Sequence, residues 1–335
     1  MRIGIDAMGG DFAPEVPVKG ALAARSMLAA DDRIVLIGDE AAIRSHLNGQ
    51  ADWQSFIRIE PAEGVIGMDE TPVEALRAKP RSSIARMAEL AARKEVDAIV
   101  SAGNTGACVA AAQMRLRRLA GVHRPGIAIV IPTFHGPVVM CDVGANPMCR
   151  PMHLYQYGIM SAEYSRALCG VAEPRVGLLS IGEEDAKGNP LVKETRALMK
   201  DGTTNYIGNV EGRDIFRGVC DVVVCDGFVG NVCLKLMEGL SEGLFKSIMQ
   251  ELHRKRPDMA EQFQQAAAKI AETFDFNEYG GAPLLGVNGV CIICHGASQC
   301  RAIAKAARVA ADFARRGLNA RIVERISKSQ GQADD

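Results

Sequence analysis

Short apolar runs rich in β-branched residues alternate with longer helical patterns along almost the whole chain of 335 residues. This order is typical of an α/β fold with a largely parallel sheet. The expected strands are Arg2–Ile5, Ile34–Ile37, Phe56–Ile59, Ala98–Val100, Ile127–Ile131, Val138–Cys141, Val176–Ile181, Asn205–Ile207, Val222–Cys225 and Val290–Cys294. The expected helices are about Val16–Ala30, Glu40–Leu47, Ser83–Lys94, Cys108–Leu119, His153–Cys169, Pro190–Lys200, Asn231–Arg254, Met259–Phe274 and Ala297–Arg315.

No linker divides the chain, so residues 1–326 are expected to form one catalytic domain, followed by a disordered tail at 327–335. One region, about 234–275, has no strand and predicts a helical hairpin with the basic tip His253–Arg256. Two interpretations of the hairpin stay open. It packs into a core or a dimer, or its apolar side chains near the tip enter an anionic membrane surface. The latter side chains are Phe245, Ile248, Met249 and Leu252.

Charge and cysteine content restrict the partners and the compartment. Lys and Arg number 39 and Asp and Glu 40, a net charge of −1 that does not favour nucleic acid. The chain has no apolar run of the length that a membrane span needs, and its N-terminus lacks an apolar signal region. Ten cysteines scattered over apolar runs suit reduced thiols. We therefore expect a cytoplasmic protein with, at most, peripheral membrane contact.

Six expected strands end in short polar segments, most of them rich in glycine. These segments are DAMGGD from Asp6, SAGNTG from Ser101, DVGAN from Asp142, GEEDAKGN from Gly182, DGFVGN from Asp226 and HGAS from His295. In a parallel sheet they would gather at the carboxyl edge, where free N–H groups of the following helices favour an anion. The Cys291–His295 stretch also fits a haem-attachment pattern, but an extended run would point Cys291 and Cys294 to opposite faces. The sequence predicts an anion-binding cleft without metal or cofactor.

These motifs, together with LLSIGEED, GNVEGRDI, DVVVCDGFVGN and YGGAPLLGVNG, resemble those of the phosphate acyltransferases of bacterial phospholipid synthesis. They occur in order from Asp6 to Ser298, over nearly the whole chain. The resemblance implies an α/β/α sandwich similar to isopropylmalate dehydrogenases and phosphotransacetylases. It further implies a homodimer that makes acyl phosphate from acyl-acyl-carrier protein and inorganic phosphate, for use by a glycerol-3-phosphate acyltransferase.

This chemistry requires phosphate in line with the thioester, donors for the oxyanion and exclusion of water, rather than a catalytic triad or a metal. Lys187 is expected to neutralise phosphate, or is a solvated surface lysine. His295 is expected to donate to the oxyanion or protonate the thiolate, or is a buried structural histidine, and Asn231 supplies a neutral donor. The other expected phosphate and thioester contacts are Asp6, Gly9, Gly10, Asn104, Thr105, Gly106, Asn146, Asn189, Asp226, Gly227 and Ser298. Asp6, Asp11 and Asp226 are expected to orient loops by capping backbone N–H groups rather than to act as bases, since a carboxylate beside phosphate is repulsive.

A basic stretch is expected to meet the acidic carrier protein. Arg115, Arg118 and Arg124 are its candidates, and the alternative, which the separate direction of Arg117 favours, is a plain solvated helix. Three other functions remain open. They are a phosphotransacetylase acting on short acyl-coenzyme A, a metal- and nicotinamide-dependent decarboxylating dehydrogenase, and a membrane-surface scaffold.

Overall fold

The computed structural model describes residues 1–261, 263–265 and 279–331, and its strands form one eleven-stranded sheet in the order β3-β2-β1-β4-β11-β10-β5-β6-β9-β7-β8. The strands are β1 (Arg2–Asp6), β2 (Arg33–Gly38), β3 (Ile57–Pro61), β4 (Ala98–Ser101), β5 (Gly126–Thr133), β6 (Gly136–Cys141), β7 (Arg175–Leu179), β8 (Asn205–Val210), β9 (Val222–Val224), β10 (Ala282–Leu285) and β11 (Cys291–Ile293).

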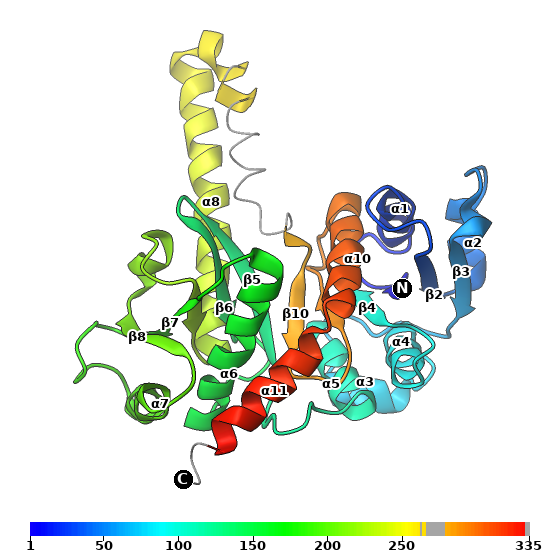
Figure 1. Cartoon of the computed structure of the whole chain (residues 1–335). Helices are drawn as coiled ribbons and strands as arrows, with labels where there is room; N and C mark the ends of the chain where they lie inside the picture. The colour runs from blue at the N-terminus through cyan, green and yellow to red at the C-terminus, as the bar shows by residue number, and fades with distance from the viewer. Residues whose placement is uncertain (262, 266–278, 332–335) are drawn as a thin grey trace.

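Helices cover both faces of the sheet (Figure 1). One face packs against α1 (Glu15–Ala24), α2 (Glu40–Leu47), α6 (Pro151–Tyr164), α7 (Pro190–Lys200), α10 (Cys300–Arg315) and α11 (Leu318–Gly331). The other packs against α3 (Pro72–Ala78), α4 (Ser83–Ala92), α5 (Thr105–Arg115) and the first turns of α8 (Gly227–Lys255). Cys291 and Cys294 belong to different cores, which confirms that they point to opposite faces. The predicted three-layer α/β/α sandwich is confirmed.

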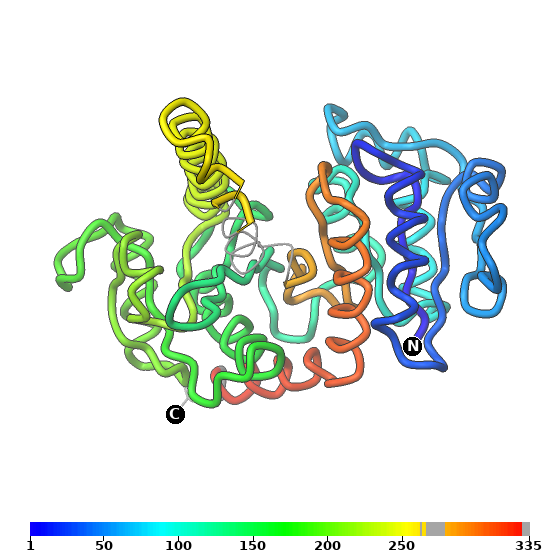
Figure 2. The backbone as a smooth tube through the Cα atoms, turned by 90° about the horizontal axis from the view of Figure 1, so that it is seen from above, coloured from blue at the N-terminus to red at the C-terminus, as the bar shows by residue number. Residues whose placement is uncertain are grey.

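The sheet consists of two parallel groups that run in opposite directions. β3, β2, β1, β4 and β11 are parallel to one another, and so are β6, β9, β7 and β8. Between the groups the pairs β11–β10, β10–β5 and β5–β6 are antiparallel. Three reversals leave the second group inverted with respect to the first. Figure 2 shows the N-terminal elements and the green central elements at opposite sides, with the orange segment that contains α10 between them.

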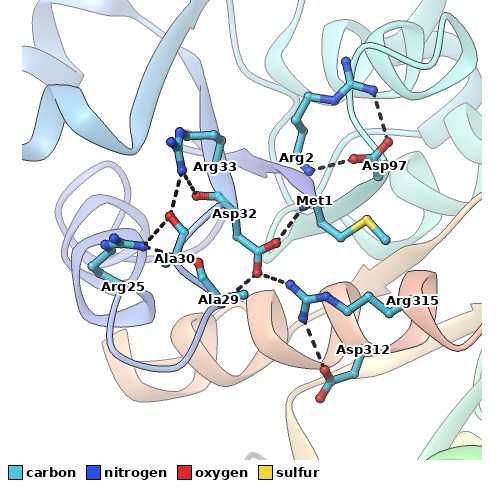
Figure 3. A network of polar contacts seen from close by, with 10 residues as sticks. All are labelled: Met1, Arg2, Arg25, Ala29, Ala30, Asp32, Arg33, Asp97, Asp312 and Arg315. Carbon is cyan, nitrogen blue, oxygen red and sulfur yellow. Dashed lines mark hydrogen bonds and ion pairs between the residues drawn. The ribbon is translucent and has the colours of Figure 1, made fainter.

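A buried carboxylate joins the N-terminus to the end of α10 (Figure 3). Asp32 accepts hydrogen bonds from the α-amino group of Met1 at 2.7 Å, from the Ala29 N–H at 2.9 Å and from Arg315. Burial opposes ionisation of Asp32, but these hydrogen bonds outweigh it and lower its pKa below the ordinary value. The first strand and the last helices are thereby held at one point.

All ten expected strands are present, but three further elements were not predicted and some element ends differ from those expected. The sequence reading missed β10, α3 and α11, and α1 ends at Ala24 rather than at Ala30. The tail expected to be disordered from Ser327 is helical as far as Gly331, because Leu318, Ile322 and Ile326 bury one face of α11. Residues 332–335 lie outside the described part.

The expected helical hairpin is seen in part. Its first helix, α8, begins four residues earlier than expected, where the Asp226 carboxylate accepts hydrogen bonds from the Phe228 and Val229 N–H groups. It ends at Lys255, before Pro257. Residues 257–261 and 263–265 are helical, and the rest of the expected second helix lies outside the described residues. Figure 1 shows most of α8 projecting away from the sheet.

Candidate active site

The inverted halves change where the polar strand ends lie. The segments after β1, β4 and β11 lie at one edge of the sheet, whereas those after β6, β7 and β9 lie at the opposite edge. The expectation that all six segments gather at one carboxyl edge was therefore wrong. A groove crosses the central strands and borders both edges, so the two sets still meet.

This central groove has a volume of about 450 Å³. It contains four of the predicted site residues, Thr105, Gly106, Asn231 and His295. The remaining lining residues are Asp11, Met68, Ile127, Ile129, Val130, Val143, Gly144, Leu234, Lys235, Glu238, Gly281, Ala282, Ile293, Cys294 and Gly296. Polar groups are thus set into largely apolar walls, an arrangement typical of a site for a ligand with one charged and one apolar part.

Lys235 and His295 face each other across the groove. Lys235 Nζ lies 3.3 Å from His295 Nε2, and 2.9 Å from the Glu238 carboxylate. The Ala297 N–H points at His295 Nδ1 at 3.2 Å, so the neutral imidazole carries its proton on Nε2. An ammonium and an N–H group then converge without an acceptor between them. Two converging donors of this kind are suited to bind one anionic oxygen.

The start of α5 adds further donors. Asn104 caps this helix by accepting the Ala107 N–H at 2.9 Å, and the next two residues, Thr105 and Gly106, line the groove. Their N–H groups belong to the first helical turn, which has no intrahelical acceptor. The helix dipole also favours negative charge at this end. One side of the groove therefore offers hydrogen-bond donors from Lys235, His295 and the start of α5, with Glu238 paired to Lys235.

Several predicted contacts at the first edge turn out to support the loop instead. The buried Asp6 accepts from Ser101 Oγ at 2.7 Å and from the Met8 N–H at 3.1 Å, and burial raises its pKa. Asn104 donates its amide to the carbonyls of Gly67, Met68 and Glu70. The polar atoms of these side chains bind other protein groups, so Asp6 and Asn104 hold the loops at this edge of the groove in place.

Gly9 and Gly10 allow the loop after β1 to pack closely. A Cβ on Gly9 would lie 2.6 Å from the Asp6 carboxylate and 2.7 Å from the Gly103 nitrogen. Gly10 has a φ of 104° and lies against the Gly296 carbonyl. Any other residue would push these loops apart. The two glycines are thus explained by packing at the edge of the groove.

At the opposite edge Asp142 and Asn146 form a buried polar cluster. Asp142 accepts the N–H groups of Ile127, Gly144, Ala145 and Asn146, while burial raises its pKa. Asn146 donates its amide to the Pro125 carbonyl, Asp142 and Tyr157. Its amide hydrogens thus already have protein acceptors, and in this arrangement they are not directed at a ligand as the sequence led us to expect. Gly227 is buried and donates to the Asn146 carbonyl at 2.9 Å.

Four other predicted residues are not among those that line the central groove. Lys187 is exposed on the loop after β7, and Asn189 caps α7 by accepting the Val192 N–H at 2.9 Å. Ser298 is buried beside the loop that carries His295, and its hydroxyl has no hydrogen-bond partner in the described structure. Asp226 caps α8, as its expected role in orienting the loop required.

The basic stretch after α5 contributes to a second groove, here called the arginine groove, of about 900 Å³. Its lining residues are Arg117, Arg118, Leu119, Gly121, Val122, His123, Arg124, Met148, Cys149, Arg150 and His153. Arg118 and Arg124 lie here as expected, but Arg115 does not; its charge acts on Glu89 of α4. Burial together with Arg124, His123 and Arg150 lowers the pKa of His153.

Sequence reasoning missed Lys235 and Arg150, and it placed Arg117 in the basic stretch but off the helix face that Arg115 and Arg118 were expected to share. Lys235 lies one helical turn after Asn231 on α8, so the predicted start of that helix already carried the necessary spacing. Among the described residues no group of three or more His, Cys, Asp or Glu side chains is placed to hold a metal ion. Burial raises the pKa of Cys294 to about 12, so this groove-lining thiol stays protonated at neutral pH.

The outer part of α8 carries an exposed apolar stripe. Leu236, Leu240, Leu244 and Ile248 follow one another at intervals of four residues and are 67%, 58%, 54% and 41% exposed. Phe245, Met249 and Leu252 are half-buried. None of the described helices combines the length and the apolar character needed to cross a bilayer.

Comparison with known proteins agrees with this architecture. A family profile described as "Fatty acid synthesis protein" matches residues 1–321. The chain is 46% identical over 336 residues to the phosphate acyltransferase of Trichlorobacter lovleyi, covering 99% of this chain and 96% of that one. It is 45% identical over 328 residues to the phosphate acyltransferase of Geobacter sulfurreducens, covering 97% and 94%.

Two solved structures share the fold. One is a phosphotransacetylase from Streptococcus pyogenes, with a TM-score of 0.62, 16% identity and 94% of each chain covered. The other is a branched-chain phosphotransacylase from Enterococcus faecalis V583, with a TM-score of 0.58 and 13% identity, covering 94% of this chain and 99% of that one. The predicted resemblance and the predicted enzyme class are confirmed. From the full-length sequence matches, this chain belongs to the phosphate acyltransferases, a family of acyl-transferring enzymes.

Proposed function

We propose that this enzyme transfers a fatty acyl group from acyl carrier protein to inorganic phosphate, giving an acyl phosphate for the acylation of glycerol 3-phosphate. Acyl transfer to phosphate follows from the family. The observation that supports the rest is the central groove, which combines the Lys235–His295 donor pair and the start of α5 with the apolar side chains of Ile127, Ile129 and Leu234.

Phosphate is ionised at neutral pH and needs no general base to become a nucleophile. In the proposed mechanism Lys235 and the first N–H groups of α5 hold phosphate next to the thioester carbon. Asn231 donates a hydrogen bond to the oxygen on which charge develops, and the His295 Nε2–H donates a hydrogen bond to the departing sulfur, which takes its proton from the attacking hydrogen phosphate. The bond between acyl carbon and sulfur breaks as the bond to the phosphate oxygen forms. The apolar walls exclude water, which would otherwise hydrolyse the acyl group.

Lys187 keeps its proposed role as a second phosphate contact. Its exposed position on the loop after β7 makes this role testable separately from that of Lys235. Lys187→Ala is expected to raise the KM for phosphate without changing the KM for the acyl donor. An unchanged KM for phosphate would leave Lys187 as a solvated surface residue.

The decisive experiment is a phosphate-dependent transfer assay on the purified chain, with acyl phosphate trapped by hydroxylamine. Long-chain acyl carrier protein, long-chain acyl-coenzyme A and acetyl-coenzyme A are compared side by side. We expect hydroxamate from the carrier-protein substrate at the lowest donor concentration, and only when phosphate is present. Preference for acetyl-coenzyme A would instead identify the phosphotransacetylase-type activity, and free fatty acid without hydroxamate would contradict acyl transfer to phosphate.

We further propose that the chain is a homodimer that binds the cytoplasmic membrane peripherally through α8 and passes its product to a glycerol-3-phosphate acyltransferase. The exposed stripe Leu236–Ile248 supports this. The charged tip supports it less, since Arg254 and Lys255 pair with Glu251, and Arg256 pairs with Asp258. Leu244→Ser/Ile248→Ser is expected to abolish flotation with anionic vesicles. If flotation persists while sedimentation shows a monomer, the stripe forms the dimer surface instead.

A further inference from the structure

The arginine groove differs from the rest of the charged surface in having cations without carboxylate partners. Elsewhere arginines pair within their own helices, as Arg44 does with Glu40 and Arg93 with Glu89. Arg117, Arg118, Arg124 and Arg150 make no ion pair in the described structure, and no Asp or Glu lines the groove. Four guanidinium groups held together without counter-charges repel one another. An acidic ligand would relieve this repulsion.

The groove is also rigidly built. The buried Gln156 on α6 accepts the His123 N–H and donates to the Gly121 carbonyl, both at 2.8 Å. Arg118 binds the His123 carbonyl, and the Arg150 N–H donates to His153 Nδ1 at 3.2 Å. The loop that carries Arg117 and Arg124 is therefore fixed to the helix whose start follows Arg150. A partner meets these side chains without first having to order the loop.

The two grooves share one segment. Val143 and Gly144 line the central groove, while Met148 and Cys149 line the arginine groove. Four residue steps separate Gly144 from Met148, so their Cα atoms are at most about 14 Å apart. An extended pantetheine arm reaches across this distance. A protein docked on the arginine groove can thus deliver a thioester to the central groove past residues 144–148.

We propose that the arginine groove docks the acidic carrier protein and that residues 144–148 form the path of its prosthetic arm. This inference rests on the proposed function for its acyl donor. It replaces the patch expected from the sequence, since Arg117 and Arg150 belong to the surface and Arg115 does not. Met148, which is 89% exposed at the groove, supplies an adaptable apolar contact beside the charges.

The test compares the double variant Arg124→Glu/Arg150→Glu with the control Arg115→Glu, an exposed arginine outside the groove. Arg117 is avoided because of its φ of 63°, and Arg118 because it holds the loop. The double variant is expected to raise the KM for long-chain acyl carrier protein tenfold or more at low salt and less at high salt. The kcat, the KM for phosphate and the KM for the same acyl group on free pantetheine should not change, and Arg115→Glu should match the wild type.

Three results would overturn the proposal. They are an equal rise in KM for acyl-pantetheine, an equal rise in the Arg115→Glu control, and a change in sedimentation showing that the groove joins two copies of this chain. Arg124→Lys/Arg150→Lys keeps the positive charges, so its KM for the carrier protein should stay close to that of the wild type. This control shows whether the effect of the Glu variant comes from charge or from a folding defect.

Binding can be measured without turnover. The dissociation constant for labelled holo carrier protein, which bears the arm but no acyl group, is measured by fluorescence anisotropy. It should rise tenfold or more with Arg124→Glu/Arg150→Glu. If the wild type binds this probe but forms no acyl phosphate, the proposed function fails while docking stands. If the wild type forms acyl phosphate but the variant binds the probe normally, only the docking proposal fails.

Discussion

Lys235 Nζ lies 3.3 Å from His295 Nε2, although the two residues are sixty positions apart in the chain. Lys235 lies in the third turn of α8, and His295 lies just after the end of β11. Because Nδ1 of His295 faces the Ala297 N–H, both facing groups are donors. Lys235 also donates to the Glu238 carboxylate at 2.9 Å, whereas the His295 Nε2–H has no acceptor in the described structure.

Replacing Lys235 by Met should weaken phosphate binding. A hydrogen bond to a charged group contributes about 1.5–3 kcal/mol, so the KM for phosphate is expected to rise roughly tenfold to a hundredfold. Lys246→Met, on the exposed outer part of α8, is the matched control and should behave as the wild type. Steady-state kinetics with phosphate varied at saturating donor measures both. A normal KM in Lys235→Met would remove this residue from the phosphate site.

Replacing His295 by Ala should act mainly on kcat. Loss of a hydrogen-bond donor to the charge that develops on the leaving sulfur typically costs about 10²–10³-fold in rate, and the loss should shrink with acyl donors whose thiols leave as thiolates more readily. The pH profile of kcat for wild type and variant, measured with two such donors, provides the check. Near-wild-type activity at every pH would show that the histidine is structural.

Asn146→Ala should destabilise the fold rather than alter phosphate binding. Its amide donates to the Pro125 carbonyl, Asp142 and Tyr157, and the variant leaves buried acceptors without partners. We expect a loss of about 2–3 kcal/mol in the free energy of unfolding. Denaturant titration and the KM for phosphate separate the two roles. A stable variant with a raised KM would restore the role expected from the sequence.

Asp32→Asn should lower stability at neutral pH by about 1–3 kcal/mol, because it removes a carboxylate bound by Arg315 and the α-amino group of Met1. The pKa of Asp32 is lowered in the folded protein, so its contribution is present above the ordinary value of 3.8 and is lost as pH falls through the lower folded pKa. Thermal melts across this acidic range should converge for wild type and variant. A constant difference down to the lowest pH would contradict the coupling.

The spacing of apolar residues predicted most helices and strands, but not β10, α3 and α11. The strand β10 contains Pro283 and follows Gly280 and Gly281, residues that usually mark turns; it forms because it pairs antiparallel with both neighbours. The helix α3 was missed even though Pro72 stands at its first position, where proline suits a helix start. For α11 the spacing of Leu318, Ile322 and Ile326 was sufficient to predict a helix.

The site was predicted less well than the fold, and the reason is strand direction. The turn Phe134–His135 between β5 and β6 reverses the chain, which inverts every later strand of the second group. Apolar patterns specify strands without specifying which way they run. The structure brings Thr105, Asn231 and His295 to one groove, whereas the amides of Asn104 and Asn146 bind protein groups. Amide side chains look alike in sequence whether they bind a ligand or another part of the protein.

The 29 residues of α8 form one continuous rod of about 44 Å, of which only the base is embedded in the protein. Asn231 and Lys235 stand on that base, and the apolar stripe occupies the free length. Because α8 is one continuous helix, any contact that tilts its free length would also move Asn231 and Lys235 at its base.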